Sequence, residues 1–588
     1  MLGSNVGRFY TAIMGLGWMG ALVLACSGAP QGVRRGSSVS DPKAAVAHAQ
    51  TQAASGRTEG RHRQVDAIFA PWSGKTTPGC AVGISRDGVL DYTRGYGMAN
   101  LEDDVAITPE SIFHVASIAK QFTAFSIRLL AQEGKLSLDD DIRKYLPEMR
   151  DYGKKISIAD LIHHTSGLRE GGQLLNLAGW RDDDLVTEAD MLWAVTKQRG
   201  LNYEPGTEAL YNNSGYTLLA VIVKRVSGQP LRAFADARIF KPLGMTDTHF
   251  HDDHTEIMPR RASGYLPREG GGWSTSIPRF EHYGSTSLFT TVGDLLKWEE
   301  NFAHARVGGR ALVASMQTSG TLTSGLATGY GSGLWIGTHR GLRTVGHGGV
   351  QAGYRADVIA FPDRRLAIVA LCNGATIAPD ELTRRVADVY LGERVAAVRL
   401  PAVKVPEAEL SPLAGVYWSR LSDEVVRVEV KDGALRSVGA PTPHVPLGDG
   451  AFRMGEIARW QFSLPAAGAP RELRITDYWP TPRVFTRVTA PVPAASTLAA
   501  FAGQYRIDEV DMTYTVRMTA GTLTLRWPRQ KEAALEAVGG DRFVNDPLGT
   551  VTFTRTASGK VDGFTISNRR LRRLRARRLV AAEARATR

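Results

Sequence analysis

FHVASIAKQFTA, residues 113–124, places Ser117 and Lys120 three positions apart at the head of an apolar run. Side chains at this spacing lie on one face of a helix, so a lysine there can reach the serine hydroxyl. A serine hydroxyl is a weak nucleophile until a neighbouring base, such as a partly desolvated lysine or a tyrosine phenolate, takes its proton. The alternative is an ordinary N-cap serine followed by a solvated lysine. Residues 40–43 repeat the spacing in a linker-like segment, so the choice depends on the rest of the chain.

Two later segments offer the groups that such a nucleophile needs. Tyr211 and Asn213 stand on a predicted turn before an apolar helix over residues 218–226, where alternately spaced side chains can point into one cleft. His347 ends a predicted strand among three glycines, which let a substrate lie close to the backbone. Taken singly, the tyrosine is equally consistent with a structural role and the histidine with a loop. His282-Tyr283-Gly284 also matches the His-x-Gly pattern.

In this order, Ser-x-x-Lys, Tyr-x-Asn and His-x-Gly resemble the motifs of the serine β-lactamase and penicillin-binding-protein superfamily. The resemblance is strongest to the group of class C β-lactamases, D-aminopeptidases and family VIII esterases, and it covers roughly residues 62–392. It implies an α+β fold in which an antiparallel sheet flanked by helices meets an all-helical subdomain at the nucleophile helix. The flanking segments that agree are Thr77-Pro78-Gly79, Gly95-Tyr96-Gly97, His164-Thr165-Ser166-Gly167-Leu168 and Lys241-Pro242-Leu243-Gly244-Met245.

The resemblance implies the catalytic roles. Ser117 would be the nucleophile and Lys120 its base or base relay. Tyr211 would carry the proton to the leaving group. The resemblance implies no cofactor and no metal. The histidine-rich segment over residues 249–254 shows no strict ligand spacing, and we expect a solvated loop there.

The resemblance also implies the substrate-binding residues. Asn213 would contact the substrate amide, and His347 and Gly349 would line the site. The backbone N–H groups of Ser117 and Val350 would form the oxyanion hole. β-Lactamases usually show Lys-Thr-Gly where this chain has His347-Gly348-Gly349. This departure removes donors for a substrate carboxylate and predicts weak hydrolysis of penicillins.

The chain beyond Pro401 changes to short alternating strands and contains an internal repeat. Five residue pairs share an offset of 88 positions: Gly415 and Gly503, Tyr417 and Tyr505, Val428 and Val516, Gly433 and Gly521, Leu435 and Leu523. A constant offset predicts two copies of one all-β unit, each a small barrel, at residues 407–490 and 496–580. Neither copy shows a cluster of titratable groups suited to catalysis.

The N-terminus has the pattern of a secretion signal over residues 1–29. The apolar run Thr11–Ala25 is short for a membrane span and suits a signal core. It ends at Val23-Leu24-Ala25-Cys26, which resembles a bacterial lipobox with Cys26 as the lipidated residue; cleavage after Ala29 is the alternative. Residues 30–61 are predicted to be a flexible linker before the hydrolase domain at 62–395. We therefore expect an exported protein, periplasmic or lipid-anchored to a bacterial cell envelope.

Composition restricts the partners. The 588 residues carry a net charge of +12, but residues 569–588 hold nine Arg against one Glu, which is typical of a charged final strand at a sheet edge. Binding to an anionic surface is the alternative, and no nucleic-acid motif supports a nucleic-acid partner. Besides Cys26 there are only Cys80 and Cys372, both in apolar strand-like runs, which we expect to be buried free thiols.

These observations favour an exported serine hydrolase that forms an acyl-enzyme at Ser117. Its substrate would be a small peptide, amide or ester. The two C-terminal β units resemble the three-domain layout of D-aminopeptidases and favour an amide of a D-residue; a carboxylesterase or a weak β-lactamase is the alternative. A hypothesis of another class is a protein that binds a cell-wall peptide without turnover.

Overall fold

The computed structural model describes residues 56, 58–392, 403–440, 442–455, 458–463, 470–479, 481–546 and 548–580. The predicted signal peptide with Cys26, and the predicted linker up to residue 55, lie outside the described residues. The chain divides into two units at residues 59 and 60, and the description below concerns the second unit, residues 60–588. Within the described ranges, none of the helices combines the length and the hydropathy that crossing a membrane would require.

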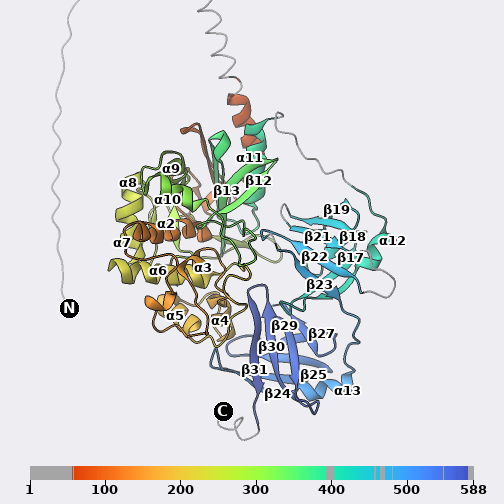
Figure 1. The fold of residues 1–588 in the computed structure, drawn as a ribbon. Helices are drawn as coiled ribbons and strands as arrows, with labels where there is room; N and C mark the ends of the chain where they lie inside the picture. Colours follow the sequence, from red (N-terminus) through yellow and green to blue (C-terminus); the bar gives the residue numbers. More distant parts are fainter. Residues whose placement is uncertain are drawn as a thin grey trace, which may run out of the picture. The chain divides into compact units, whose positions relative to one another are not determined.

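A six-stranded antiparallel sheet organises the first part of this unit (Figure 1). Its strand order is β12-β13-β14-β15-β1-β2, so the first strands of the domain pair with the last one. This confirms the predicted fold class and a sheet built from both ends of the domain. The strands are β1 (Cys80–Arg86), β2 (Val89–Tyr96), β12 (Trp335–His339), β13 (Leu342–Gln351), β14 (Tyr354–Phe361) and β15 (Leu366–Cys372).

The pairing of β1 with β15 joins two cysteines. Cys80 lies directly opposite Cys372 in the antiparallel register, and the two sulfur atoms are 2.06 Å apart, in a disulfide. The expectation of two free thiols was wrong. Because 292 residues separate the two cysteines in the sequence, only the register of the sheet reveals that their side chains meet.

Helices cover both faces of the sheet. The helix over residues 60–69 and α11 (Pro379–Leu391) pack on one face, where Val65, Phe69 and Val386 are buried against strand residues. α9 (Val292–His304) packs on β1 and β15 on the other face, beside the helical subdomain. That subdomain comprises α2 (Ala119–Gln132), α3 (Ile158–Ile162), α4 (Gly171–Leu177), α5 (Glu188–Thr196), α6 (Asn213–Ser227), α7 (Leu231–Ala235), α8 (Lys241–Leu243) and α10 (Gly309–Met316).

Local sequence signals fix the ends of α6, which carries one side of the site. The side chain of Asn212 accepts a hydrogen bond from the backbone N–H of Gly215, so it caps the first turn. Gly228 ends the helix with a φ of 75°, a conformation that glycine adopts without steric cost. Between these caps the helix buries an apolar stripe against α2, which holds the two helices in register across the site.

Two all-β units follow, as the repeat predicted. The first forms an open eight-stranded sheet among the described residues, and the second forms a closed eight-stranded barrel. The repeat is visible in detail, since the hydroxyl of Tyr417 donates to the Leu413 carbonyl and that of Tyr505 donates to the Phe501 carbonyl. Their strands are β16 (Gly415–Trp418), β17 (Val425–Lys431), β18 (Ala434–Ser437), β19 (Val445–Gly448), β20 (Ala451–Met454), β21 (Ala458–Phe462), β22 (Glu472–Thr476) and β23 (Arg483–Arg487), then β24 (Gly503–Ile507), β25 (Met512–Thr519), β26 (Thr522–Arg526), β27 (Ala533–Gly539), β28 (Arg542–Asn545), β29 (Gly549–Arg555), β30 (Val561–Asn568) and β31 (Leu571–Arg578).

The arginine-rich final strand is not an edge strand. β31 pairs with β30 on one side and with β24 on the other, and these pairings close the barrel. Leu571, Leu574 and Ala576 are buried in the barrel, while Arg573 and Arg575 are exposed. The alternation of apolar and charged residues therefore reflects the two faces of a barrel strand.

Candidate active site

Ser117 lies in a short 3₁₀ turn, Ala116–Ile118, directly before α2. The helical spacing of Ser117 and Lys120 predicted that both lie in one α-helix. In the structure Ser117 lies in the 3₁₀ turn just before that helix. The preceding residue, Ala116, has a φ of 47°, which is strained for a residue with a side chain. Strand β13 packs closely against this turn: a Cβ added to Gly349 would come within 2.2 Å of the Val115 carbonyl oxygen. Only glycine allows the strand to approach the nucleophile turn this closely.

Lys120 is fully buried beneath Ser117. Its Nζ lies 3.1 Å from the Oγ of Ser117, and it donates to Oδ1 of Asn213 and to the carbonyl of Ser285, both at 2.7 Å. Burial lowers the pKa of Lys120 well below its ordinary value; the carboxylate of Glu170 opposes this shift, and the positive charge of Arg570 adds to it. A neutral amine has two N–H groups and one lone pair. In the neutral form of Lys120, the two carbonyl acceptors would occupy the N–H groups and leave the lone pair for the serine hydroxyl.

Tyr211 lies on the other side of the nucleophile, with Nζ of Lys120 4.9 Å from its ring centroid. Burial raises the pKa of Tyr211, while a hydrogen bond with Ser117 and the charge of Arg570 oppose this rise only in part. The phenol is therefore protonated at neutral pH. It can donate a proton, but it cannot act as the resting base.

The predicted substrate-binding residues lie around the same point. His347 is buried on β13, with its Nε2 3.1 Å from the hydroxyl of Tyr330. Burial lowers the pKa of His347 to about 3, with Lys120 as a secondary cause, so this histidine is neutral at physiological pH. Val350 follows on the same strand, with 66% of its surface exposed.

These groups share one cleft of about 1480 Å³. Six of the seven predicted site residues line it: Ser117, Tyr211, Asn213, His347, Gly349 and Val350. Lys120 lies beneath its floor and reaches the cleft through Ser117. The structure thus brings together residues from three distant segments of the chain.

The structure also adds residues that the motifs did not indicate. The second His-x-Gly match, His282-Tyr283-Gly284, also lies at the site, because His282 lines the cleft and Ser285 offers its carbonyl to Lys120. His164 is buried 4.4 Å from the Tyr211 ring, measured between ring centroids, and its Nδ1 accepts from the backbone N–H of Asn212. Its segment was noted only as a flank. A carbonyl ligand leaves no side-chain signal in the sequence, so Ser285 could not have been found in this way.

Both C-terminal β units contribute to the cleft. The loop between β22 and β23 supplies Tyr478 and Trp479, whose rings lie 4.6 Å and 4.9 Å from the ring of Trp335. The turn between β30 and β31 supplies Arg569 and Arg570. The sequence suggested no active-site role for either unit, because each contributes only the tip of one hairpin.

The histidine-rich segment is not the solvated loop that was expected. His249 and Phe250 form strand β7, and His251 is buried. Ligand atoms of His249, His251 and Glu256 lie within 4.8 Å of one another. Arg232 donates two hydrogen bonds to Glu256, so the positive charge beside this cluster is that of a guanidinium.

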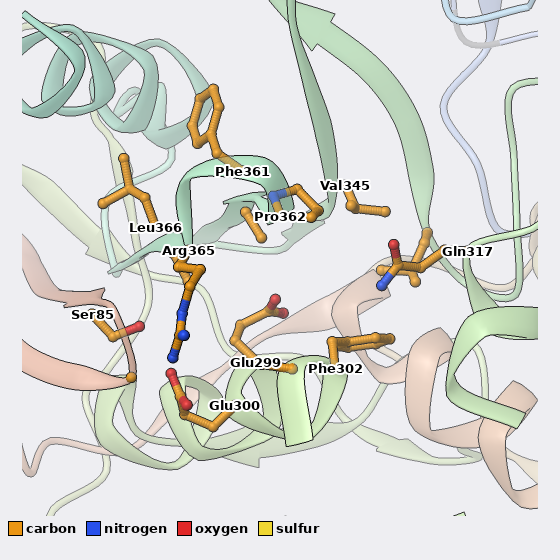
Figure 2. Close-up of a pocket in the computed structure, with 15 residues that line it drawn as sticks. Ser85, Glu299, Glu300, Phe302, Gln317, Val345, Phe361, Pro362, Arg365 and Leu366 are labelled. Carbon is orange, nitrogen blue, oxygen red and sulfur yellow. The ribbon is translucent and has the colours of Figure 1, made fainter. Parts of the chain in front are cut away.

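A second, smaller cavity of about 190 Å³ is separate from the cleft but shares Val345 with its lining (Figure 2). Phe302, Val345 and Leu366 give it an apolar lining, and the side chain of Glu299 points into it. Oε1 of Glu299 is buried and has no hydrogen-bond partner among the described residues. Burial raises the pKa of Glu299 to about 8. None of the site residues named above lines this cavity.

Comparison with known proteins finds relatives among D-aminopeptidases and a penicillin-binding protein homologue. A D-aminopeptidase from Brucella anthropi is 28% identical over 302 residues, which are 50% of this chain and 56% of that protein, so the chain spans little more than half of the relative's length. A D-aminopeptidase from Gluconobacter oxydans is 24% identical over 76% of this chain and 83% of its own length. The octameric penicillin-binding protein homologue from Pyrococcus abyssi shares the fold, with a TM-score of 0.53 and 23% identity over 73% of this chain and 99% of that chain.

Two family models match the sequence. A domain of unknown function (DUF3471) matches residues 487–578, which include the closed barrel. The β-lactamase family matches residues 65–393, which include every predicted site residue. Because this match spans more than half of the sequence, the chain belongs to the β-lactamase family.

Proposed function

We propose that this protein is an exported serine hydrolase that forms an acyl-enzyme at Ser117 and acts on amides of D-residues. The observation that carries the proposal is the buried amine of Lys120, held 3.1 Å from Oγ of Ser117 with its N–H groups already engaged. A lone pair directed at a hydroxyl is what a general base requires.

The proton path follows from the two shifted pKa values. Lys120, neutral at rest, takes the proton of Ser117 while Oγ bonds to the substrate carbonyl carbon. The backbone N–H groups of Ser117 and Val350 are the proposed donors to the resulting oxyanion. Tyr211, protonated at rest, gives its proton to the leaving amine as the C–N bond breaks, and Lys120 returns a proton to the tyrosine. Water then attacks the acyl group and restores Ser117.

The substrate class rests on the relatives and on the second half of the chain. The curated relatives named above are D-aminopeptidases, and the Gluconobacter oxydans protein aligns over 76% of this chain. The position of Asn213 supports an amide substrate, because its Oδ1 accepts from Lys120 and the residue lines the cleft. Small esters and β-lactams are the alternative substrates in this family.

Export is supported by two features. The run Thr11–Ala25 has the pattern of a signal core, and the disulfide between Cys80 and Cys372 suits an oxidising compartment. Lipidation of Cys26 stays a prediction, which mass spectrometry of the membrane fraction after expression in a Gram-negative host would test.

Covalent labelling tests the proposed nucleophile. A fluorophosphonate or a labelled penicillin should mark the wild-type protein and Ser73→Ala, which removes an exposed hydroxyl, and should fail to mark Ser117→Ala. Label on another serine would contradict the assignment. Labelling without turnover of any D-aminoacyl anilide, nitrophenyl ester or nitrocefin would favour a binding protein instead.

A further inference from the structure

The turn between β30 and β31 brings Arg570 into the cleft beside the proposed proton donor. The Cζ atom of Arg570 lies 5.2 Å from the centroid of the Tyr211 ring, and the residue lines the same cleft as Ser117. Arg570 acts electrostatically on both Tyr211 and Lys120, and its charge lowers the pKa of each. A barrel residue thus stands close to the proposed catalytic groups.

Among the described residues, this guanidinium has no carboxylate within ion-pair distance. Its Cζ atom lies over the Tyr211 ring. Its neighbour Arg569 differs, because Asp477 accepts a hydrogen bond from it at 3.0 Å. The nearby carboxylate of Glu170 accepts from the backbone N–H of Asn213 at 2.7 Å. Arg570 is therefore a half-buried, unpaired charge at the wall of a cleft.

The turn that carries Arg570 is held firmly in place. Asn202 donates to the backbone carbonyl of Arg570 at 3.1 Å and accepts from the backbone N–H of Arg572 at 2.9 Å. Arg572 binds both oxygens of Glu208 at 3.0 Å. Asn568 accepts from the backbone N–H of Arg570 at 3.0 Å. This network fixes the backbone of the turn while the Arg570 side chain faces the cleft. Because the backbone is already ordered, less conformational entropy is lost when a ligand binds.

We propose that Arg570 forms a subsite for a substrate carboxylate on the leaving-group side of the scissile amide. A guanidinium offers paired N–H donors that match the two oxygens of a carboxylate, and a charge-assisted pair of this kind is stronger than a neutral hydrogen bond. The leaving-group side follows from the position beside Tyr211, which gives its proton to the leaving amine in the function proposed above, on which this inference rests. The substrate class is a short D-residue peptide with a free carboxylate next to the bond that is cut.

A matched pair of substrates tests the subsite. D-Alanyl-3-aminobenzoate and D-alanyl-3-aminobenzamide differ only in replacing a carboxylate by a carboxamide. The wild-type protein should prefer the benzoate, and Arg570→Ala should lower kcat/KM for the benzoate by roughly 10–100-fold while changing the benzamide little. Arg570→Lys keeps the positive charge but lacks the paired N–H donors of a guanidinium, so it should retain part of the preference for the benzoate that Arg570→Ala loses. Arg575→Ala removes an exposed arginine of strand β31, which follows the turn, and should leave both rates unchanged.

Two outcomes would overturn the inference. An equal loss for both substrates would show that Arg570 acts only through the protonation of Tyr211 and Lys120, and unchanged rates would show no role. Binding of 3-acetamidobenzoate to Ser117→Ala and to Ser117→Ala/Arg570→Ala, measured by calorimetry, needs no turnover. A tenfold or greater loss of affinity in the double variant supports the subsite even if the proposed reaction fails. No binding, or equal binding by both, contradicts it.

Discussion

The side-chain nitrogen of Lys120 lies 3.1 Å from the Oγ of Ser117, and the lysine is completely buried. Burial destabilises the charged form of an amine, so a lysine in this position can serve as a base near neutral pH. The neighbouring Tyr211 is shifted in the opposite sense by the same physical cause. One desolvated pocket thus yields a base and an acid from two residues whose ordinary pKa values are almost equal.

The first prediction concerns the pH dependence of acylation. The rate requires neutral Lys120, whose pKa is lowered, and protonated Tyr211, whose pKa is raised. We therefore expect kcat/KM to rise with pH through a group well below 10.5 and to stay on a plateau past pH 10. Steady-state kinetics with a neutral ester over this range would check the profile. A rate that rises only near the ordinary lysine pKa would contradict the assignment of Lys120.

The second prediction addresses the two proton carriers separately. Lys120→Met keeps the length of the side chain and removes the base, and Tyr211→Phe removes the acid; each should slow acylation by about 10²–10⁴-fold. Lys135→Met, at an exposed lysine after α2, is the control and should keep the wild-type rate. Stopped-flow measurement of acyl-enzyme formation separates acylation from turnover. If both site variants acylate at near-wild-type rates, the proton leaves Ser117 by another route.

The sequence was sufficient to predict what periodicity and motif spacing encode. The resemblance of the motifs implied the α+β fold, and the constant offset of 88 positions predicted the repeat of the β units; the structure confirms both. The seven predicted site residues converge on one cleft, and each motif is short enough that its own residues stay close together.

Other features depend on tertiary contacts that no local pattern records. The disulfide between Cys80 and Cys372 depends on a strand register that joins residues 292 positions apart. The contribution of Arg570 depends on how one barrel turn meets the cleft, and that of Ser285 on a backbone carbonyl. The burial of His347 likewise depends on neighbours from other segments, among them Tyr330.

The third prediction concerns that burial. An exposed histidine would gain charge as the pH falls towards 6, and it would then attract substrate carboxylates. Burial instead lowers the pKa of His347 to about 3, so the residue stays neutral down to acidic pH. We expect the ratio of kcat/KM for nitrocefin to that for a nitrophenyl ester to stay flat between pH 5 and 8. A ratio that rises as the pH falls through about 6.5 would show that His347 titrates in the ordinary range.

The fourth prediction concerns the covalent link across the sheet. The bond between Cys80 and Cys372 joins strands from the two ends of the domain and closes a loop of nearly 300 residues. Removing a native disulfide typically costs about 2–4 kcal/mol, so Cys80→Ala/Cys372→Ala should unfold at lower temperature than the wild-type protein. Dithiothreitol should lower the midpoint temperature of unfolding of the wild-type protein and should leave that of the double variant unchanged. Alkylation of both Cys80 and Cys372 in the protein unfolded without reductant, found by mass spectrometry, would contradict the link.

The last prediction concerns the small cavity and its acid. The pKa of Glu299 is about 8 in the folded protein against 4.5 for an exposed glutamate, so the folded state holds a proton that the unfolded state releases between these values. Stability from this residue is therefore fully present below pH 4.5 and is lost as the pH rises towards 8, because the unfolded chain binds fewer protons. Each pKa unit is worth about 1.4 kcal/mol, so the loss is on the order of a few kcal/mol.

Glu299→Gln keeps the shape of the side chain and removes this titration. The free energy of unfolding of the variant should therefore not fall between pH 4.5 and 8, and at pH 8.5 it should be higher than that of the wild-type protein. Denaturant unfolding at pH 5, 7 and 8.5 measures the difference, and Glu102→Gln, at an exposed position, is the control that should follow the wild-type protein. Because Glu299 lies outside the cleft, hydrolysis by Glu299→Gln should stay at the wild-type rate. Parallel stability curves for the wild-type protein and Glu299→Gln would mean that solvent reaches the carboxylate and that its pKa is not raised.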